Sequence, residues 1–295
     1  MVRWQGTFQA ITVAAVSYTH LDVYKRQQEE GSFVKHARWF AVPAAGVLAA
    51  AGVMSVAAAP FASAASELGS GGVALQVHGA SSGNWSGYAD TQKVGYTFVE
   101  ANWTEPSYTC DGNSPESSAI WVGIDGYSSS TVEQGGTIAI CSGKNQGAHE
   151  AWWEMYPTNN VQEVFAIKVG DKMFASVTYR AGKSQPYDIV VKDLTSGKSL
   201  NKLEACLAGC LNNSAEWIVE SPSFSTGTAY LPKFAPIKFT NGFASDAVNG
   251  ANPVSISSFT HVSITMTGAQ PKRAVPSALT SNGEGFTDKW VSSKP

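Results

Sequence analysis

Charged side chains are scarce in this chain. Asp, Glu, Lys and Arg make up only 15% of its 295 residues. After residue 64 there are 15 lysines and arginines against 20 aspartates and glutamates, and just two of the cations are arginines, Arg180 and Arg273. A chain with a negative balance and no basic stripe is poorly suited to neutralise a row of phosphates. We therefore expect no nucleic-acid partner.

Helical patterns are missing as well. After residue 64 no segment repeats its apolar residues with the period of a helix; short runs rich in Val, Ile, Thr and aromatic residues recur instead. Dipeptides typical of turns separate them, at Asp125-Gly126, Gly170-Asp171, Ser196-Gly197 and Asn241-Gly242. The predicted strands are 95–104, 119–125, 137–141, 149–156, 164–169, 173–180, 187–192, 215–220, 237–240 and 262–267.

This pattern predicts the fold class. Many short strands with hairpin-sized spacing indicate an all-β protein built as a sandwich of two antiparallel sheets. Neither a linker nor an internal repeat divides the strand-rich part. We therefore assign residues 84–295 to one β-sandwich domain, and we expect it to be a monomer.

The segment 34–64 differs from the rest of the chain. It has a basic start at Lys35 and Arg38, an Ala/Val-rich apolar run, and a small-residue ending, Ala62-Ser63-Ala64, which together are typical of a secretory signal peptide. We therefore expect a secreted, extracellular protein without stable membrane association after cleavage. A membrane-spanning helix over 39–58 is the alternative, because that run is about the ~20 residues that a bilayer requires.

Two further assignments follow from a signal at 34–64. Residues 1–33 are interpreted as a mis-assigned upstream segment, because secretion signals stand at the start of a chain. Residues 65–83 are interpreted as a short pro-segment or a flexible N-terminus.

Four cysteines, all after residue 64, predict disulfide bonds, because the count is even and the chain is expected to be secreted. Three pairings are possible. We favour Cys110 with Cys141 and Cys206 with Cys210, since the second pair brackets a tight loop just before the 215–220 strand. The C-x3-C spacing has no Cys or His partner at ligand distance in the sequence. We therefore expect neither a metal nor another cofactor.

Strand alternation shows which side chains share a face. In A-H-E-A-W-W-E-M-Y, Trp152, Glu154 and Tyr156 point to one side of the predicted strand. The same rule places Trp121 and Asp125 together on one face of the strand W-V-G-I-D. Taken alone, such a stripe is more typical of an ordinary solvated sheet face than of a binding site.

The motifs carry more information in combination. Glu216 lies in a strand-like A-E-W-I-V-E, and Gln134 lies upstream in T-V-E-Q-G-G, between A-I-W-V-G-I-D-G and W-W-E-M-Y-P. In this order the motifs resemble the glutamic peptidase (eqolisin) family, from N-W-S-G-Y at residue 84 through F-T-N at residue 239. The C-x3-C spacing departs from the family's fungal members, and no long basic propeptide precedes Asn84.

The resemblance implies both a fold and a site. The fold would be a two-sheet, concanavalin-like sandwich with a concave face that binds polypeptide substrates. Glu216 and Gln134 would be the catalytic pair of a secreted, acid-active endopeptidase. The residues implied to line its substrate cleft are Trp121, Asp125, Trp152, Glu154 and Tyr156.

Such a pair can hydrolyse a peptide bond without a metal or a covalent nucleophile. Glu216 would act as general base on water and later return the proton to the leaving amine. Gln134 would orient the water and donate its amide hydrogens to the developing oxyanion, an interaction that contributes on the order of 3 kcal/mol. With an unshifted carboxyl that titrates near ~4.3, we expect activity in mildly to strongly acidic conditions.

Other functions stay open at this point. Glu154 and Glu216 could be the acid and nucleophile of a retaining glycosidase if their carboxyls were ~5 to 5.5 Å apart. A non-catalytic, lectin-like module would need only the aromatic groove, and a Ser/His/Asp triad that uses His261 is a weaker alternative because no pattern assembles it. Gln134 separates these hypotheses, because only the peptidase requires an amide beside Glu216.

Overall fold

The chain folds almost entirely into β-strands. The computed structural model describes residues 78–92, 95–247, 252–270 and 272–295. Within these residues the one helical element is a single 3-10 turn, η1 (Ile256–Ser258), and none of their helices has the length and apolar character to cross a membrane. The predicted all-β class is therefore confirmed. The segments assigned above as 1–33 and 34–64, and most of 65–83, lie outside the described residues.

One layer of the fold is an antiparallel sheet that ends in a parallel strand. β1 (His78–Ser82) lies parallel to its neighbour, β18, so that the ordered sheet begins inside the segment interpreted above as 65–83. The other strands, in spatial order, are β8 (Asn159–Ala166), β7 (Asn145–Tyr156), β6 (Val132–Ser142), β5 (Ser117–Ile124), β12 (Ala215–Glu220), β2 (Trp85–Asp90) and β18 (His261–Met266). We call this layer the first sheet.

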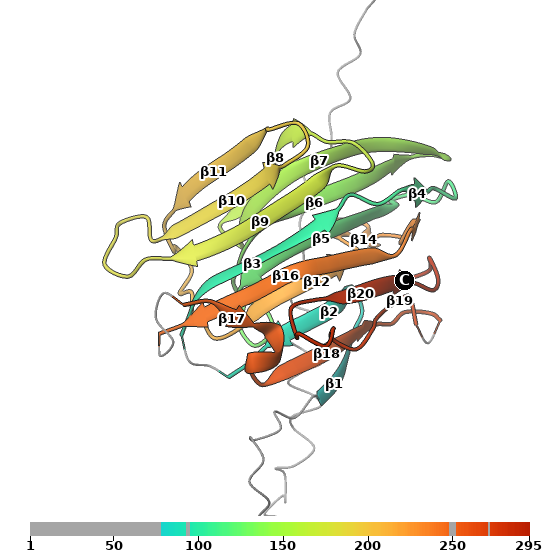
Figure 1. Cartoon of the computed structure of the whole chain (residues 1–295). Helices are drawn as coiled ribbons and strands as arrows, with labels where there is room; N and C mark the ends of the chain where they lie inside the picture. Colours follow the sequence, from blue (N-terminus) through green and yellow to red (C-terminus); the bar gives the residue numbers. More distant parts are fainter. Residues whose placement is uncertain (1–77, 93–94, 248–251, 271) are drawn as a thin grey trace, which may run out of the picture.

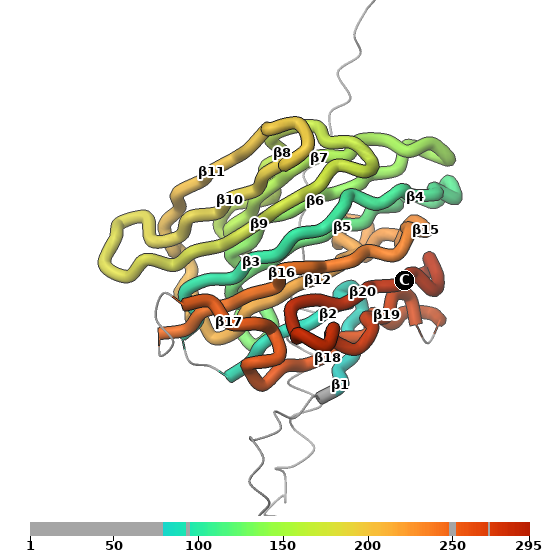
Figure 2. The backbone as a smooth tube through the Cα atoms, viewed as in Figure 1, coloured from blue at the N-terminus to red at the C-terminus, as the bar shows by residue number. Residues whose placement is uncertain are grey.

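The second sheet lies over the first, and Figures 1 and 2 show the two as stacked layers. Its strands, in spatial order, are β11 (Ser199–Glu204), β10 (Tyr187–Asp193), β9 (Lys172–Tyr179), β3 (Tyr96–Thr104) and β16 (Ile237–Asp246), with β17 (Val254–Ser255) paired to the end of β16. The predicted two-sheet antiparallel sandwich is confirmed.

The two sheets are joined along one edge. The start of β16 pairs with β20 (Phe286–Trp290), and β20 continues through β19 (Ala274–Pro276) to β18 of the first sheet. Two small pairs lie outside this path: β4 (Tyr108–Thr109) with β15 (Lys233–Phe234), and β13 (Ser223–Phe224) with β14 (Gly227–Thr228).

The main core fills the space between the layers. Strands β3, β9 and β10 pack against β5, β6 and β12. The side chains that meet there include Val122 and Trp217 from the first sheet and Val99 and Ile189 from the second, all fully buried. Burying one such side chain contributes about 1.5–3 kcal/mol. A second apolar cluster covers the opposite face of the first sheet, so that β5 is buried at every position.

Strand β2 was not predicted, because W-S-G-Y-A-D contains no run of β-branched residues. Gly87 lies in its middle with φ of 141°, and a Cβ there would come within 2.0 Å of the Trp217 carbonyl oxygen. Only glycine permits this close approach of β2 to β12. Sequence reasoning also missed β1, β11 and the C-terminal strands β19 and β20, since S-L-N-K-L-E of β11, for example, is a polar edge strand with little β-branched character.

The prediction of a turn at Asn241-Gly242 is wrong. Both residues lie inside β16, where the pairing with β3 shifts register between Thr240 and Phe243. Asn241 has φ of 51°. An Asn-Gly pair supplies the left-handed backbone that a β-bulge needs just as it does in a hairpin turn, so the sequence signal is the same for both. The other three predicted turns lie between strands.

Candidate active site

The register of the first sheet brings three polar residues into one row. Glu216 of β12 pairs with Gly123 of β5, Gly123 with Gln134 of β6, and Gln134 with Glu154 of β7. Directly paired residues project from the same face of a sheet. Their chain neighbours Val122 and Trp217 point into the inter-sheet core. The carboxyl, amide and carboxyl groups of the row therefore lie on the face turned away from the second sheet.

Gly123 separates Glu216 from Gln134 and has no side chain between them. With strands about 4.8 Å apart, the Cα atoms of Glu216 and Gln134 are about 10 Å apart, and both long side chains can lean over the glycine. A Cβ on Gly123 would lie 3.2 Å from the Gln134 Cβ and 3.0 Å from the Trp121 ring. Sequence reasoning did not single out this residue, although the glycine of W-V-G-I-D was its signal.

Tryptophans form the next row of the same face. Trp121 and Trp152 stand on either side of Gly136, and both are fully buried. Tyr156, at the end of β7, packs against the same cluster. The predicted grouping of Trp121, Trp152, Glu154 and Tyr156 on one face thus agrees with the register.

A short hydrogen bond joins Gln134 to Glu154. The Gln134 Nε2 donates to the Glu154 Oε2 at 2.7 Å. This bond fixes which end of the amide faces β7 and directs the Oε1 end elsewhere. Glu154 therefore contacts the amide itself, in addition to any contact with a ligand.

Burial dominates the electrostatics of the site. It raises the pKa of Glu216 well above its ordinary value; the charge of Asp125 raises it further, while the Ser214 hydroxyl and the Tyr127 N–H, 3.3 Å from Oε1, oppose the rise. Burial raises the pKa of Glu154 too, followed by the charge of Glu220. The ~4.3 of an unshifted carboxyl is therefore not the reference for Glu216, because the sequence alone does not show desolvation.

Glu220 is a third buried carboxyl on this face, and sequence reasoning missed it. It accepts hydrogen bonds from Trp121 Nε1 at 2.9 Å and from Asn84 Nδ2 at 3.1 Å. Burial raises its pKa to about 8. Its signal was the second glutamate of A-E-W-I-V-E, which strand alternation places on the same face as Glu216. The hydrogen bond from Trp121 to Glu220 holds the indole ring in place.

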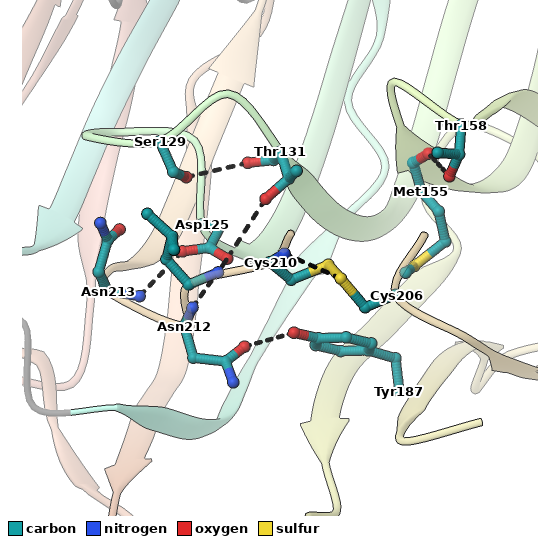
Figure 3. The surroundings of a disulfide bond; sticks show 11 residues. Asp125, Ser129, Thr131, Met155, Thr158, Tyr187, Cys206, Cys210, Asn212 and Asn213 are labelled. Atoms are coloured by element: carbon teal, nitrogen blue, oxygen red, sulfur yellow. Dashed lines mark hydrogen bonds between the residues drawn. A yellow bond between two sulfur atoms is a disulfide. The ribbon is translucent and has the colours of Figure 1, made fainter. Parts of the chain in front are cut away.

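Asp125 does not join the row, contrary to the predicted place of its side chain. Its carboxylate accepts the backbone N–H groups of Leu211, Asn212 and Asn213 at 2.7, 2.8 and 2.8 Å, as Figure 3 shows for the last two. The physical reason is backbone geometry: Asp125 has φ of 68°, so β5 has ended at Ile124 and the alternation rule no longer applies.

Both disulfides have the favoured pairing. Cys110 is bonded to Cys141 with Cα atoms 5.9 Å apart, and Cys206 to Cys210 with Cα atoms 6.0 Å apart. The first bond lies at the start of β5 and the second near its end. Within the described residues, the group whose side chains are close enough to share a metal is Cys110, Glu116 and Cys141, and its two sulfurs form the first disulfide.

Comparison with known proteins identifies relatives. The model of the Peptidase A4 family matches residues 83–290. No curated protein matches the chain. A crystal structure of scytalido-glutamic peptidase with a peptide-based transition-state analogue is 21% identical, covers 71% of this chain and 98% of its own, and superposes with a TM-score of 0.59. SCP-B, described as an eqolisin in complex with the tripeptide Ala-Ile-His, is also 21% identical with the same coverages and a TM-score of 0.57.

Proposed function

We propose that Glu216 and Gln134 are the catalytic pair of this chain, which belongs to the Peptidase A4 family of glutamic peptidases. A member of this family is a peptide hydrolase. The observation that carries the proposal is the single row of paired residues in which Gly123 alone separates the two side chains. Substrates would be polypeptides; Tyr156, which is half-buried on the same face, would contact them, whereas Trp121 and Trp152 are fully buried.

The chemistry needs one water molecule. Glu216 takes a proton from the water as its oxygen bonds to the peptide carbonyl carbon, and the carbonyl oxygen becomes an oxyanion. An N–H of the Gln134 amide stabilises that oxyanion. Glu216 then gives the proton to the amide nitrogen, the C–N bond breaks, and a carboxylic acid and an amine leave.

The raised pKa of Glu216 shifts the working pH. A general base must be ionised, so activity rises as the pH passes upward through the pKa of Glu216. Because burial raises that pKa, the acid limb of the profile should lie above the ~4.3 of a free glutamate. We therefore propose a mildly acidic optimum. We also propose that the protein is secreted and acts outside the cell, where its two disulfides would persist.

The geometry gives no support to the glycosidase alternative. Glu154 and Glu216 are three strands apart, about 14 Å between Cα atoms, and Gln134 lies between them. The neighbouring charge that raises the pKa of Glu154 is that of Glu220 and not that of Glu216. A retaining glycosidase needs its two carboxyls ~5 to 5.5 Å apart.

The test compares two substitutions in the row. Gln134→Ala should lower kcat/KM for a denatured protein substrate by roughly two to three decades, because it removes the oxyanion donor. Glu154→Gln keeps an acceptor for the Gln134 amide and should leave measurable turnover. Assays should cover about pH 2 to 7, with and without pepstatin. A folded Gln134→Ala variant that cleaves at the rate of the unaltered protein would falsify the assignment.

A further inference from the structure

We infer that Asp125 is a positioning residue that holds Glu216 in place by binding the loop in front of strand β12. The loop runs from the Cys206–Cys210 disulfide to Ser214 and is called the anchor loop below. This inference rests on the proposed role of Glu216. It gives Asp125 a different task from the substrate contact that the sequence predicts.

Backbone hydrogen bonds tie the anchor loop to the end of β5. One Asp125 carboxylate oxygen accepts the N–H groups of Leu211 and Asn212, and the other accepts that of Asn213. The Asp125 N–H donates to the Ser214 carbonyl oxygen at 3.0 Å. One residue thus binds four consecutive residues of the loop. Figure 3 shows the carboxylate facing Asn212 and Asn213.

The bound segment leads directly into the catalytic strand. Ser214 is followed by Ala215, the first residue of β12, and then by Glu216. On the other side of Asp125, the Tyr127 N–H contacts Glu216 Oε1 at 3.3 Å. Asp125 therefore fixes the backbone that leads into Glu216. It also positions the Tyr127 N–H, which donates to the Glu216 carboxyl. A displacement of the anchor loop would move Glu216 along the row relative to Gln134.

Packing alone does not hold the anchor loop. Leu207 is 71% exposed and Leu211 is 60% exposed, so its two leucines bury little apolar surface. The disulfide closes the five residues before Leu211, and the Cys210 N–H contacts the Cys206 Sγ at 2.8 Å. The disulfide, whose cysteines pack against the main core, and the Asp125 carboxylate therefore hold the loop, together with the Tyr96 N–H, which donates to the Asn212 carbonyl oxygen at 2.7 Å. The Tyr187 hydroxyl also donates a hydrogen bond to the Asn212 Oδ1.

The charge of Asp125 supplies a second, independent signature. It raises the pKa of Glu216, so its removal should lower that pKa. Two other buried carboxyls are coupled to Glu216 by charge, Asp90 on β2 and Glu133 on β6, and strand pairing places both on the inter-sheet face of the first sheet. Changing Asp125 also removes a charge that raises the pKa of Glu133, which is hydrogen-bonded to Asp125, whereas Asp90 is raised by burial and by Glu216.

Asp125→Asn tests the inference, because the side chain keeps its shape but replaces one acceptor oxygen with an NH2 group. We expect kcat to fall roughly 10- to 100-fold with KM unchanged within about twofold, the pattern of a misplaced catalytic group. The acid limb of the pH profile should move to lower pH. Hydrogen exchange at Leu211–Asn213 and at Glu216 should become faster. A higher KM with unchanged exchange would show a substrate contact instead and overturn the inference.

The disulfides provide a matched pair of controls. Cys206→Ser/Cys210→Ser should speed exchange at Leu211–Asn213 and Glu216 and lower kcat, even if Asp125→Asn does not fold. Cys110→Ser/Cys141→Ser should lower stability. In the protein that remains folded, hydrogen exchange at these residues and kcat should be unchanged. Unchanged exchange at Glu216 in the Cys206/Cys210 variant would overturn the inference. If the unaltered protein cleaves no peptide, the proposed function fails, whereas the exchange measurements still decide whether Asp125 anchors this loop.

Discussion

The two faces of the first sheet use the same strands for different purposes. Toward the second sheet, β5 and β12 place Ile120, Val122 and Trp217 in the apolar inter-sheet core. Toward the other side, the alternate positions of the same sheet place Glu216 and Gln134 in a row. Neighbouring residues should therefore affect different properties, stability on one face and catalysis on the other.

The largest effect is expected on the catalytic face. Glu216→Gln removes the general base but keeps the shape, so kcat/KM should fall by roughly four decades or more. The same change removes a buried carboxyl whose pKa is raised, so the variant should be as stable as the unaltered protein at pH 3 and more stable at pH 7. Kinetics and thermal melts at both pH values measure this. If Glu216→Gln still cleaved the substrate, the assignment of catalysis to this face would be wrong.

The pH dependence of stability should be the next largest effect, and it involves both faces. Burial raises the pKa of several carboxyls, so the folded protein keeps protons that the unfolded chain loses near pH ~4. The stability that these groups contribute is then greatest below about pH 4 and declines as the pH rises, up to about 1.4 kcal/mol per pH unit for each group, whereas Asp193, whose pKa is lowered by hydrogen bonds, contributes in the opposite sense. The decline should continue through the pKa of about 7 for Asp288 and of about 8 for Glu220. The other groups are Asp90, Glu133, Glu154 and Glu216.

Urea unfolding between about pH 3 and pH 8 measures this decline. Glu220→Gln should flatten it, because the amide that replaces the carboxyl does not titrate. A free energy of unfolding that rises over this range would contradict the assigned pKa directions. Activity and stability thus respond to pH in opposite senses, since Glu216 must be ionised to act and protonated to be buried at low cost.

A smaller effect is expected from the inter-sheet face. Ile120 is fully buried and lies next to Trp121 in the chain, so Ile120→Ala should lower the free energy of unfolding by about 2–5 kcal/mol through the cavity that it leaves. The kcat of the folded fraction should stay within about twofold. Ile120→Val, expected to cost about 0.5–1.5 kcal/mol, is the matched control. Activity lost out of proportion to the unfolded fraction would mean that the faces are coupled.

Local patterns predicted the strands wherever alternation is regular. The W-W-E-M-Y segment gave the correct face for Trp152, Glu154 and Tyr156, because side-chain direction in a strand depends only on the local period. The same rule failed at Asp125, where the backbone leaves the extended region. It also missed β2, whose glycine and small residues are explained only by the strand that packs beside it.

The sequence by itself determined the all-β class, a favoured pairing of the cysteines and the motifs that mark the family. Each depends on residue types and on spacing along the chain. The tertiary structure alone decided the register that places Gly123 between Glu216 and Gln134, the amides of the anchor loop on Asp125, and the raised pKa of the buried carboxyls. Register and desolvation come from segments distant in the sequence, and strand alternation contains no information about them.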